Sequence, residues 1–169
     1  MSVRAHRIYW LSWAVATGTT GIVAGFFLGH ALLLGPFVDW LLVSGRANVL
    51  ASTYPVFRQG EGKVGFDVFY AIAALQILAA LAFAAASIVA RRPGLGIVAG
   101  AAAIAWPLVH YGSGFAAIEA SVLRTTTAAT RELAASFVAW NGPIHLFHVG
   151  VLLVGLIALL LAPLSSAPE

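Results

Sequence analysis

The chain has 169 residues, of which 61% are hydrophobic and only 9% are charged, and its mean hydropathy is +0.95. Ordinary soluble domains carry roughly 25% charged residues, so this composition excludes that class. The net charge of +3 does not indicate nucleic-acid binding, because the basic residues are scattered around predicted helix ends instead of forming a patch. The absence of cysteine excludes disulfides, thiolate metal sites and iron–sulfur clusters.

Four long stretches contain no Asp, Glu, Lys or Arg: residues 8–38, 68–90, 93–118 and 133–168. Each exceeds the roughly 20 residues with which a helix crosses the hydrocarbon layer, where only a helix or a closed barrel satisfies the backbone. We predict an all-α integral membrane protein of one domain, an antiparallel up-down-up-down four-helix bundle with two long loops on one side. The predicted spans cover residues 8–35, 66–90, 94–113 and 143–162.

Four glycines recur at spacings of three and four in the first predicted span: Gly18, Gly21, Gly25 and Gly29. Such a stripe favours close packing against another helix, because association in lipid relies on contacts between small residues. The pair Gly35-Pro36 is expected to end this helix. The long segment that follows is interpreted either as a loop on the bilayer surface or as a lid over a site.

The second and third predicted spans each carry polar groups at one end. Asp67 and Tyr70 occupy the first turn of the second span, and an acid there is also explained by the helix dipole. Residues 91–94, Arg-Arg-Pro-Gly, predict a tight turn between the two spans. In the third span Pro107 is expected to bend the helix shortly before His110.

The stretch Trp140-Asn141-Gly142-Pro143-Ile144-His145-Leu146-Phe147-His148 is the most distinctive in the chain. Asn141 is expected to cap the fourth span, and Pro143 suits a first helical turn because its missing N–H costs nothing there. His145 and His148, three residues apart, then lie on one face of that helix.

The basic residues give an orientation. Arginines occupy the short segments before the first span and between the second and third, which predicts cytoplasmic termini in a bacterial inner membrane and both long loops outside. The alternation of spans then places four of the five histidines in the outer third of the bundle. Ionisable groups inside a membrane are costly and usually functional. These four are His30, His110, His145 and His148.

Neutral imidazole is a good ligand for copper or iron, so these four histidines predict a metal site, completed by Asp67 or a water molecule. An alternative cofactor is haem b, held from opposite sides by His30 and His110 beside the glycine stripe. A third interpretation is a polar network without any ligand, or histidines on different helix faces.

The chain resembles the anthrone-oxygenase-like family of small four-helix membrane proteins. The matching residues are the run Gly-Ile-Val-Ala-Gly-Phe-Phe at 21–27 followed by Gly35-Pro36, and Trp140-Asn141 followed by His145. The resemblance implies an oxygenase acting on an aromatic polyketide. His148 departs from the family pattern, in which we expect an arginine, and this leaves the substrate open.

The sequence thus predicts a membrane oxidoreductase or oxygenase that acts on a lipophilic or aromatic small molecule at the metal. The candidate catalytic side chains are Asp67, as proton acceptor, and Tyr111. The pocket is expected to be walled by aromatic side chains, Trp106, Trp140, Phe147 and Tyr111. The alternative is a noncatalytic haem- or pigment-binding subunit, packed as a homo-oligomer or within a larger membrane complex.

Overall fold

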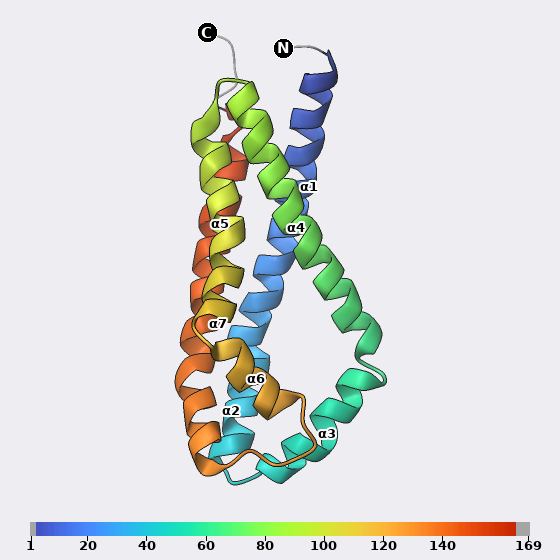
Figure 1. The fold of residues 1–169 in the computed structure, drawn as a ribbon, viewed down its shortest axis with the longest axis vertical. Coiled ribbons are helices and arrows are strands. Elements are labelled where there is room, and N and C mark those ends of the chain that lie inside the picture. Colours follow the sequence, from blue (N-terminus) through green and yellow to red (C-terminus); the bar gives the residue numbers. More distant parts are fainter. Residues whose placement is uncertain (1–2, 165–169) are drawn as a thin grey trace. The chain divides into compact units, whose positions relative to one another are not determined.

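The computed structural model describes residues 3–164, and within that range it contains helices and no strand (Figure 1). Seven α-helices and one π-helical turn follow one another in the order α1 (Val3–Gly29), η1 (His30–Leu34), α2 (Gly35–Val43), α3 (Ala47–Gln59), α4 (Lys63–Val89), α5 (Pro93–Gly112), α6 (Phe115–Leu123) and α7 (Arg131–Leu161).

Four helical stretches in the described part of the chain are long and apolar enough to cross a membrane. They are Val3–Val43, Lys63–Val89, Pro93–Gly112 and Arg131–Leu161. The prediction of an all-α protein with four such helices is confirmed, and the long segments between them also contain helices, α3 and α6.

The prediction that Gly35-Pro36 ends the first helix is wrong, because α1 continues through η1 into α2. The N–H of Gly35 donates to the carbonyl of His30, five residues earlier, which is the π-helical hydrogen bond. Pro36 follows at the start of α2. A proline removes a donor and crowds the carbonyl four residues before it, and the widened turn in front of Pro36 accommodates both effects.

The predicted start of the fourth helix at residue 143 is also wrong. The helix α7 begins at Arg131, so Asn141 and Pro143 lie inside it and Asn141 is not a cap. The preceding residues 133–140 are mostly alanine and other apolar residues that readily form a helix once packed in a core. The side chain of Asn141 is therefore available for contacts with other helices.

The chain divides into two compact units. Among the described residues, unit 1 contains 3–25, 70–106 and 148–164, and unit 2 contains 26–69 and 107–147. The helices α1, α4, α5 and α7 each contribute residues to both units.

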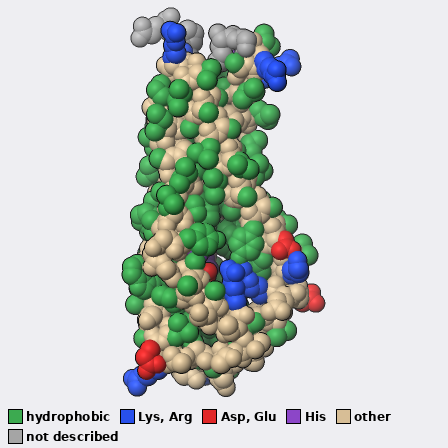
Figure 2. Space-filling model, viewed as in Figure 1, with side chains coloured by type: hydrophobic (Ala, Val, Ile, Leu, Met, Phe, Trp, Pro, Cys, Tyr) green, Lys and Arg blue, Asp and Glu red, His purple; other side chains and the backbone are tan. Residues whose placement is uncertain are grey.

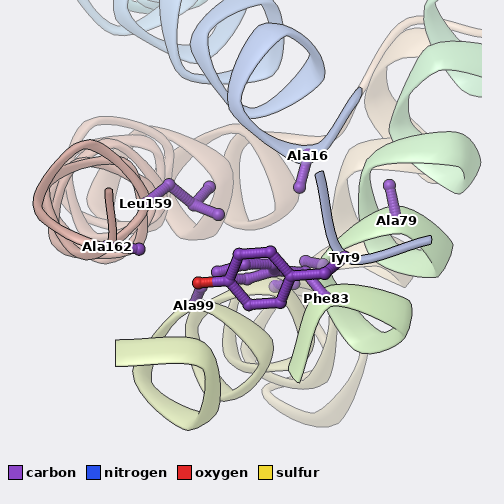
Figure 3. Packing of buried hydrophobic residues seen from close by; sticks show 9 residues of the cluster. Tyr9, Ala16, Ala79, Phe83, Ala99, Leu159 and Ala162 are labelled. Atoms are coloured by element: carbon purple, nitrogen blue, oxygen red, sulfur yellow. The ribbon is translucent and has the colours of Figure 1, made fainter. Parts of the chain in front are cut away.

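The core of unit 1 is rich in alanine. The rings of Tyr9 and Phe83 lie 5.2 Å apart between centroids, with small side chains around them (Figure 3). The helices α4 and α5 pack closely at Gly96, which has no side chain. A Cβ at this position would come within 2.5 Å of the Ser87 hydroxyl oxygen. The buried cluster consists of Tyr9, Ala16, Ala79, Ala80, Phe83, Ala99, Ala103, Leu159 and Ala162.

The core of unit 2 is built from larger side chains of α2, α3, α6 and α7. Phe115 and Phe137 are fully buried, with ring centroids 5.8 Å apart. The segments between the spans are therefore packed against α7 within this unit. The buried cluster consists of Val38, Leu41, Leu42, Leu50, Phe115, Val122, Leu123, Phe137 and Ile144.

The glycine stripe of α1 is not packed against another helix of the described chain. A Cβ built at any of the four positions would meet nothing within 4 Å. The close helix contacts predicted for this stripe occur elsewhere, for example at Gly155, where a Cβ would come within 2.9 Å of the Ala102 methyl group. The stripe positions are Gly18, Gly21, Gly25 and Gly29.

Candidate functional site

Two buried imidazole rings are stacked in unit 2. His30 lies in the π-helical turn η1 and His145 lies in α7, and their side chains are 8% and 2% exposed. The ring centroids are 3.8 Å apart and the ring planes differ by 21°. Residues 115 positions apart in sequence thus share one site inside an apolar helical protein, where buried polar groups are costly and usually functional.

Asn141 connects this pair to a carboxylate. Its Nδ2 amide donates to Asp39 Oδ1 at 2.9 Å, so its Oδ1 faces His30 and accepts from the Nε2–H of that ring at 3.3 Å. The amide is 1% exposed, and a Cβ at Gly35 would come within 3.1 Å of its nitrogen. The chain Asp39–Asn141–His30 therefore fixes a tautomer of His30 with the hydrogen on Nε2 and the lone pair on Nδ1.

The same asparagine also orients the second ring. His145 Nδ1–H donates to the backbone carbonyl of Asn141 at 2.8 Å, one helical turn earlier. This hydrogen bond places the lone pair of His145 on Nε2. Both imidazoles thus carry one defined donor nitrogen and one defined basic nitrogen, which is how a histidine is prepared to accept a proton.

Aromatic side chains surround the stacked pair. Phe27 and Phe115 are 5% and 0% exposed, and their ring centroids lie 5.9 and 5.8 Å from that of His145. An apolar environment of this kind excludes water and strengthens the electrostatic interactions inside it.

His110 also contacts Phe115. Its ring centroid is 5.6 Å from that of Phe115, and its Nε2 is 3.7 Å from Glu119 Oε2. Burial raises the pKa of Glu119, and the positive charges of Arg124 and Arg58 partly oppose this shift. Three of the four predicted histidines, at positions 30, 110 and 145, therefore belong to unit 2.

The fourth histidine belongs to unit 1. His148 is fully buried, and its ring lies edge-on to Trp106 at 5.9 Å between centroids. Trp106 Nε1–H donates to Gln76 Oε1, and Gln76 Nε2 donates to Thr20 Oγ1, both at 3.3 Å. The predicted cofactor contact Trp106 is thus part of a second buried polar network, which links α1, α4 and α5.

The remaining predicted site residues are exposed. Asp67 pairs with Lys63 one turn earlier on the surface of α4, with 60% of its side-chain area accessible. Tyr111, Trp140 and Phe147 are 67%, 49% and 42% exposed, so they do not form the closed wall of a buried pocket.

The described side chains do not show the predicted metal site, and the predicted cofactors stay predictions. Among residues 3–164, no group of three or more His, Asp or Glu side chains is arranged to hold a metal ion. Lone pairs of imidazole lie in the ring plane, so the nearly parallel rings of His30 and His145 do not direct them at one point. The stacking of His30 and His145 does not bear on the predicted haem pair, His30 and His110, so haem stays a prediction.

No protein-family model, curated protein or solved structure matches this chain. The resemblance to the anthrone-oxygenase-like family therefore stays a prediction.

Two residues at the centre of the site were not selected from the sequence. Asn141 was interpreted as a helix cap and Asp39 as part of a surface loop. The available signal was an asparagine in the middle of a long uncharged run, because an amide inside a membrane helix needs partners from another helix.

Proposed function

We propose that this protein is a membrane oxygenase that removes a proton from a lipophilic aromatic substrate and directs the resulting carbanion to dioxygen. The observation that carries the proposal is the buried, stacked pair His30 and His145, oriented by Asn141 and backed by Asp39. The proposal keeps the oxygenase activity expected from the family resemblance and replaces metal chemistry with base catalysis.

The geometry supports a base, the His30–His145 pair, that accepts one proton. Two imidazolium charges at 3.8 Å would repel each other strongly in an apolar site, so the pair holds one added proton at most. Asp39, through Asn141, stabilises the positive charge that develops when His30 accepts a proton. General base catalysis by a positioned histidine contributes about 100- to 10,000-fold to a rate.

The reaction that fits is oxidation of an activated methylene group to a ketone. A methylene between two aryl rings, conjugated through them with a carbonyl, loses a proton to the base, and the carbanion forms a C–O bond with dioxygen. The peroxide takes a proton back from the imidazolium, and the hydroperoxide then eliminates water to leave a new carbonyl. One methylene and one dioxygen thus give one ketone and one water, without an additional reductant.

Space for such a substrate is supported by two glycines next to the histidines. Gly29 precedes His30, and Gly142 lies one turn before His145 in α7; a Cβ at either position would meet nothing within 4 Å. A flat aromatic molecule dissolved in the bilayer would approach the imidazoles past these positions.

For the arrangement in the membrane, we propose the antiparallel up-down-up-down order of spans with both termini in the cytoplasm of a bacterium. The support is the distribution of arginine in the short segments, including Arg91 and Arg92 between α4 and α5. The lipid bilayer and a lipophilic small molecule are then the partners of the chain.

The experiment uses the purified full chain in detergent, with anthrone as the substrate and an oxygen electrode as the readout. His145→Phe and His30→Phe should each lower oxygen uptake by about 100-fold or more, since the base is removed. His6→Phe is the matched control, because His6 is exposed on α1 and should leave the rate unchanged.

Elemental analysis of the same samples separates base catalysis from metal catalysis. Base catalysis predicts oxygen uptake that persists in chelator and does not follow copper or iron content. Stoichiometric copper or iron in the wild type that disappears in both histidine variants, together with the activity, would refute the base mechanism and restore the metal site.

The noncatalytic subunit is a second candidate, favoured by the open glycine stripe of α1. Small residues without a partner inside the chain offer a face for a helix of another protein. An absorption spectrum with a haem or pigment band, in a sample that consumes no oxygen with anthrone, would favour this candidate over the enzyme.

A further inference from the structure

A cavity of about 460 Å³ in unit 2 is lined largely by basic side chains. It lies where the end of α3, the start of α4 and the end of α6 meet. Figure 2 shows basic side chains gathered next to hydrophobic ones on the face of the molecule in view. The lining residues are Pro55, Arg58, Gln59, Lys63 and Arg124.

The cations that line the cavity have carboxylates nearby that do not line it. Lys63 pairs with Asp67, and Glu119 lies near enough to Arg58 and Arg124 for their charges to act on it. The lining of the cavity itself contains three cations and no carboxylate.

Arg58 is held in a defined orientation. Its guanidinium carbon lies over the Phe66 ring, 4.2 Å from the centroid, a cation–π contact that helps to position the cation. The N–H donors of a guanidinium lie in its plane, in a fork that matches the oxygen atoms of a phosphate group.

The cavity lies at the end of a membrane span. Lys63 is the first residue of α4, one of the four stretches long enough to cross a bilayer. Large apolar residues that neighbour the lining residues in sequence are exposed, including Val56, Phe57 and Val64 at 63%, 51% and 72%. A ligand in the cavity would therefore have its charged group among cations and its remainder beside apolar surface, which is the chemistry of a lipid.

We propose that this cavity binds the phosphate group of an anionic phospholipid, with the acyl chains along the exposed apolar side chains of α3 and α4. Phosphate is recognised by arginine in preference to other cations because two N–H donors engage two oxygens. Free phosphate shares the charged group but lacks the apolar part, so the two sources can be separated by experiment.

The test measures lipid binding to the full chain in neutral detergent by native mass spectrometry. The probes are phosphatidylglycerol, phosphatidylcholine and inorganic phosphate. The double variant Arg58→Gln/Arg124→Gln should bind phosphatidylglycerol about 25-fold more weakly, since each basic residue near an anionic headgroup contributes about fivefold. Phosphatidylcholine should bind the wild type weakly, and the double variant should change that binding little.

Two further variants serve as controls, one for misfolding and one for a general effect of net charge. Arg58→Lys/Arg124→Lys keeps both charges and should retain binding within about fivefold, with the loss due to the missing fork. Arg46→Gln/Arg131→Gln removes the same charge from exposed positions that do not line this cavity and should bind phosphatidylglycerol as the wild type does.

Three results would overturn the proposal. Equal binding of phosphatidylglycerol by the Arg58/Arg124 glutamine variant and the wild type would show that the cavity is not the site. An equal loss in the Arg46/Arg131 variant would show that net charge alone attracts the lipid. Saturation of the site by inorganic phosphate, with displacement of the lipid at equal concentration, would assign the cavity to a free anion.

Discussion

At the scale of single residues, Asn141 connects the polar side chains of the candidate site. Its side chain contacts Asp39 and His30, and its backbone carbonyl accepts from His145. In a low-dielectric interior such linked hydrogen bonds strengthen one another, and an unsatisfied member is costly. One amide therefore positions both imidazoles and separates the carboxylate from them.

Replacing this amide tests that role. Asn141→Leu leaves the polar groups of His30 and Asp39 without their partner and should lower the free energy of unfolding by about 1–3 kcal/mol. Asn48→Leu is the matched control, because Asn48 is exposed and should change stability by no more than about 0.5 kcal/mol. Thermal or denaturant unfolding in detergent measures both. Equal stability of the two variants would contradict the role of Asn141 in satisfying His30 and Asp39.

Glu119 gives a pH dependence whose sign follows from its environment. Burial raises the pKa of this carboxyl in the folded protein, so folding favours the protonated form. The contribution to stability is fully present below the unfolded pKa and is lost as the pH rises through the raised folded pKa. The unfolding midpoint should therefore fall less steeply with rising pH in Glu119→Gln than in the wild type. Equal slopes of the unfolding midpoint against pH in the two proteins would contradict a raised pKa of Glu119.

At the scale of elements, the π-helical turn η1 explains how His30 reaches the site. A π turn inserts one extra residue into a helix and rotates the side chains that follow relative to those before it. Here the turn begins at His30 and leads into Gly35-Pro36 without ending the helix. The proline that would stop a regular helix thus coincides with the widened turn that carries the imidazole.

Packing of α4 against α5 depends on a missing side chain. A Cβ at Gly96 would lie 2.6 Å from that of Ser87 and 3.3 Å from the Ala84 Cα, so Gly96→Ala should destabilise the protein by about 1–3 kcal/mol. Gly94→Ala, two residues earlier in the same helix and in open space, should be neutral or stabilising by up to about 1 kcal/mol. Unfolding in detergent compares the two. A stable Gly96→Ala protein would mean that these helices separate easily.

At the scale of the whole molecule, the absence of cysteine makes the proposed topology directly testable. Single cysteines at Ser44 and Thr126, in the segments between spans, should react with a membrane-impermeant maleimide added to intact cells. A cysteine at Gly94, after the arginine pair, should react only after the membrane is opened. All three positions are exposed. Reaction at Gly94→Cys alone in intact cells would show that the orientation is the opposite of the proposed one. Equal reaction at all three positions would refute the alternation of spans.

The amino-acid sequence by itself determined the class of protein and the number of apolar helices. Length and absence of charge are sufficient for this, because a bilayer admits few alternatives to a helix. It also singled out four histidines, of which the structure stacks two, His30 and His145. The loops were less predictable, since α2, α3 and α6 form helices through contacts with α7 that no local pattern reveals.

Only the tertiary structure decided which histidines meet and what they can do. His30 and His145 come together because α1 continues through a π turn and α7 begins at Arg131, before the expected cap. Both boundaries depend on packing, which overrides the local preferences of proline and asparagine for helix ends. The stacking of the rings, which directs their lone pairs away from a common metal ion, likewise follows from how two helices lie against each other within unit 2.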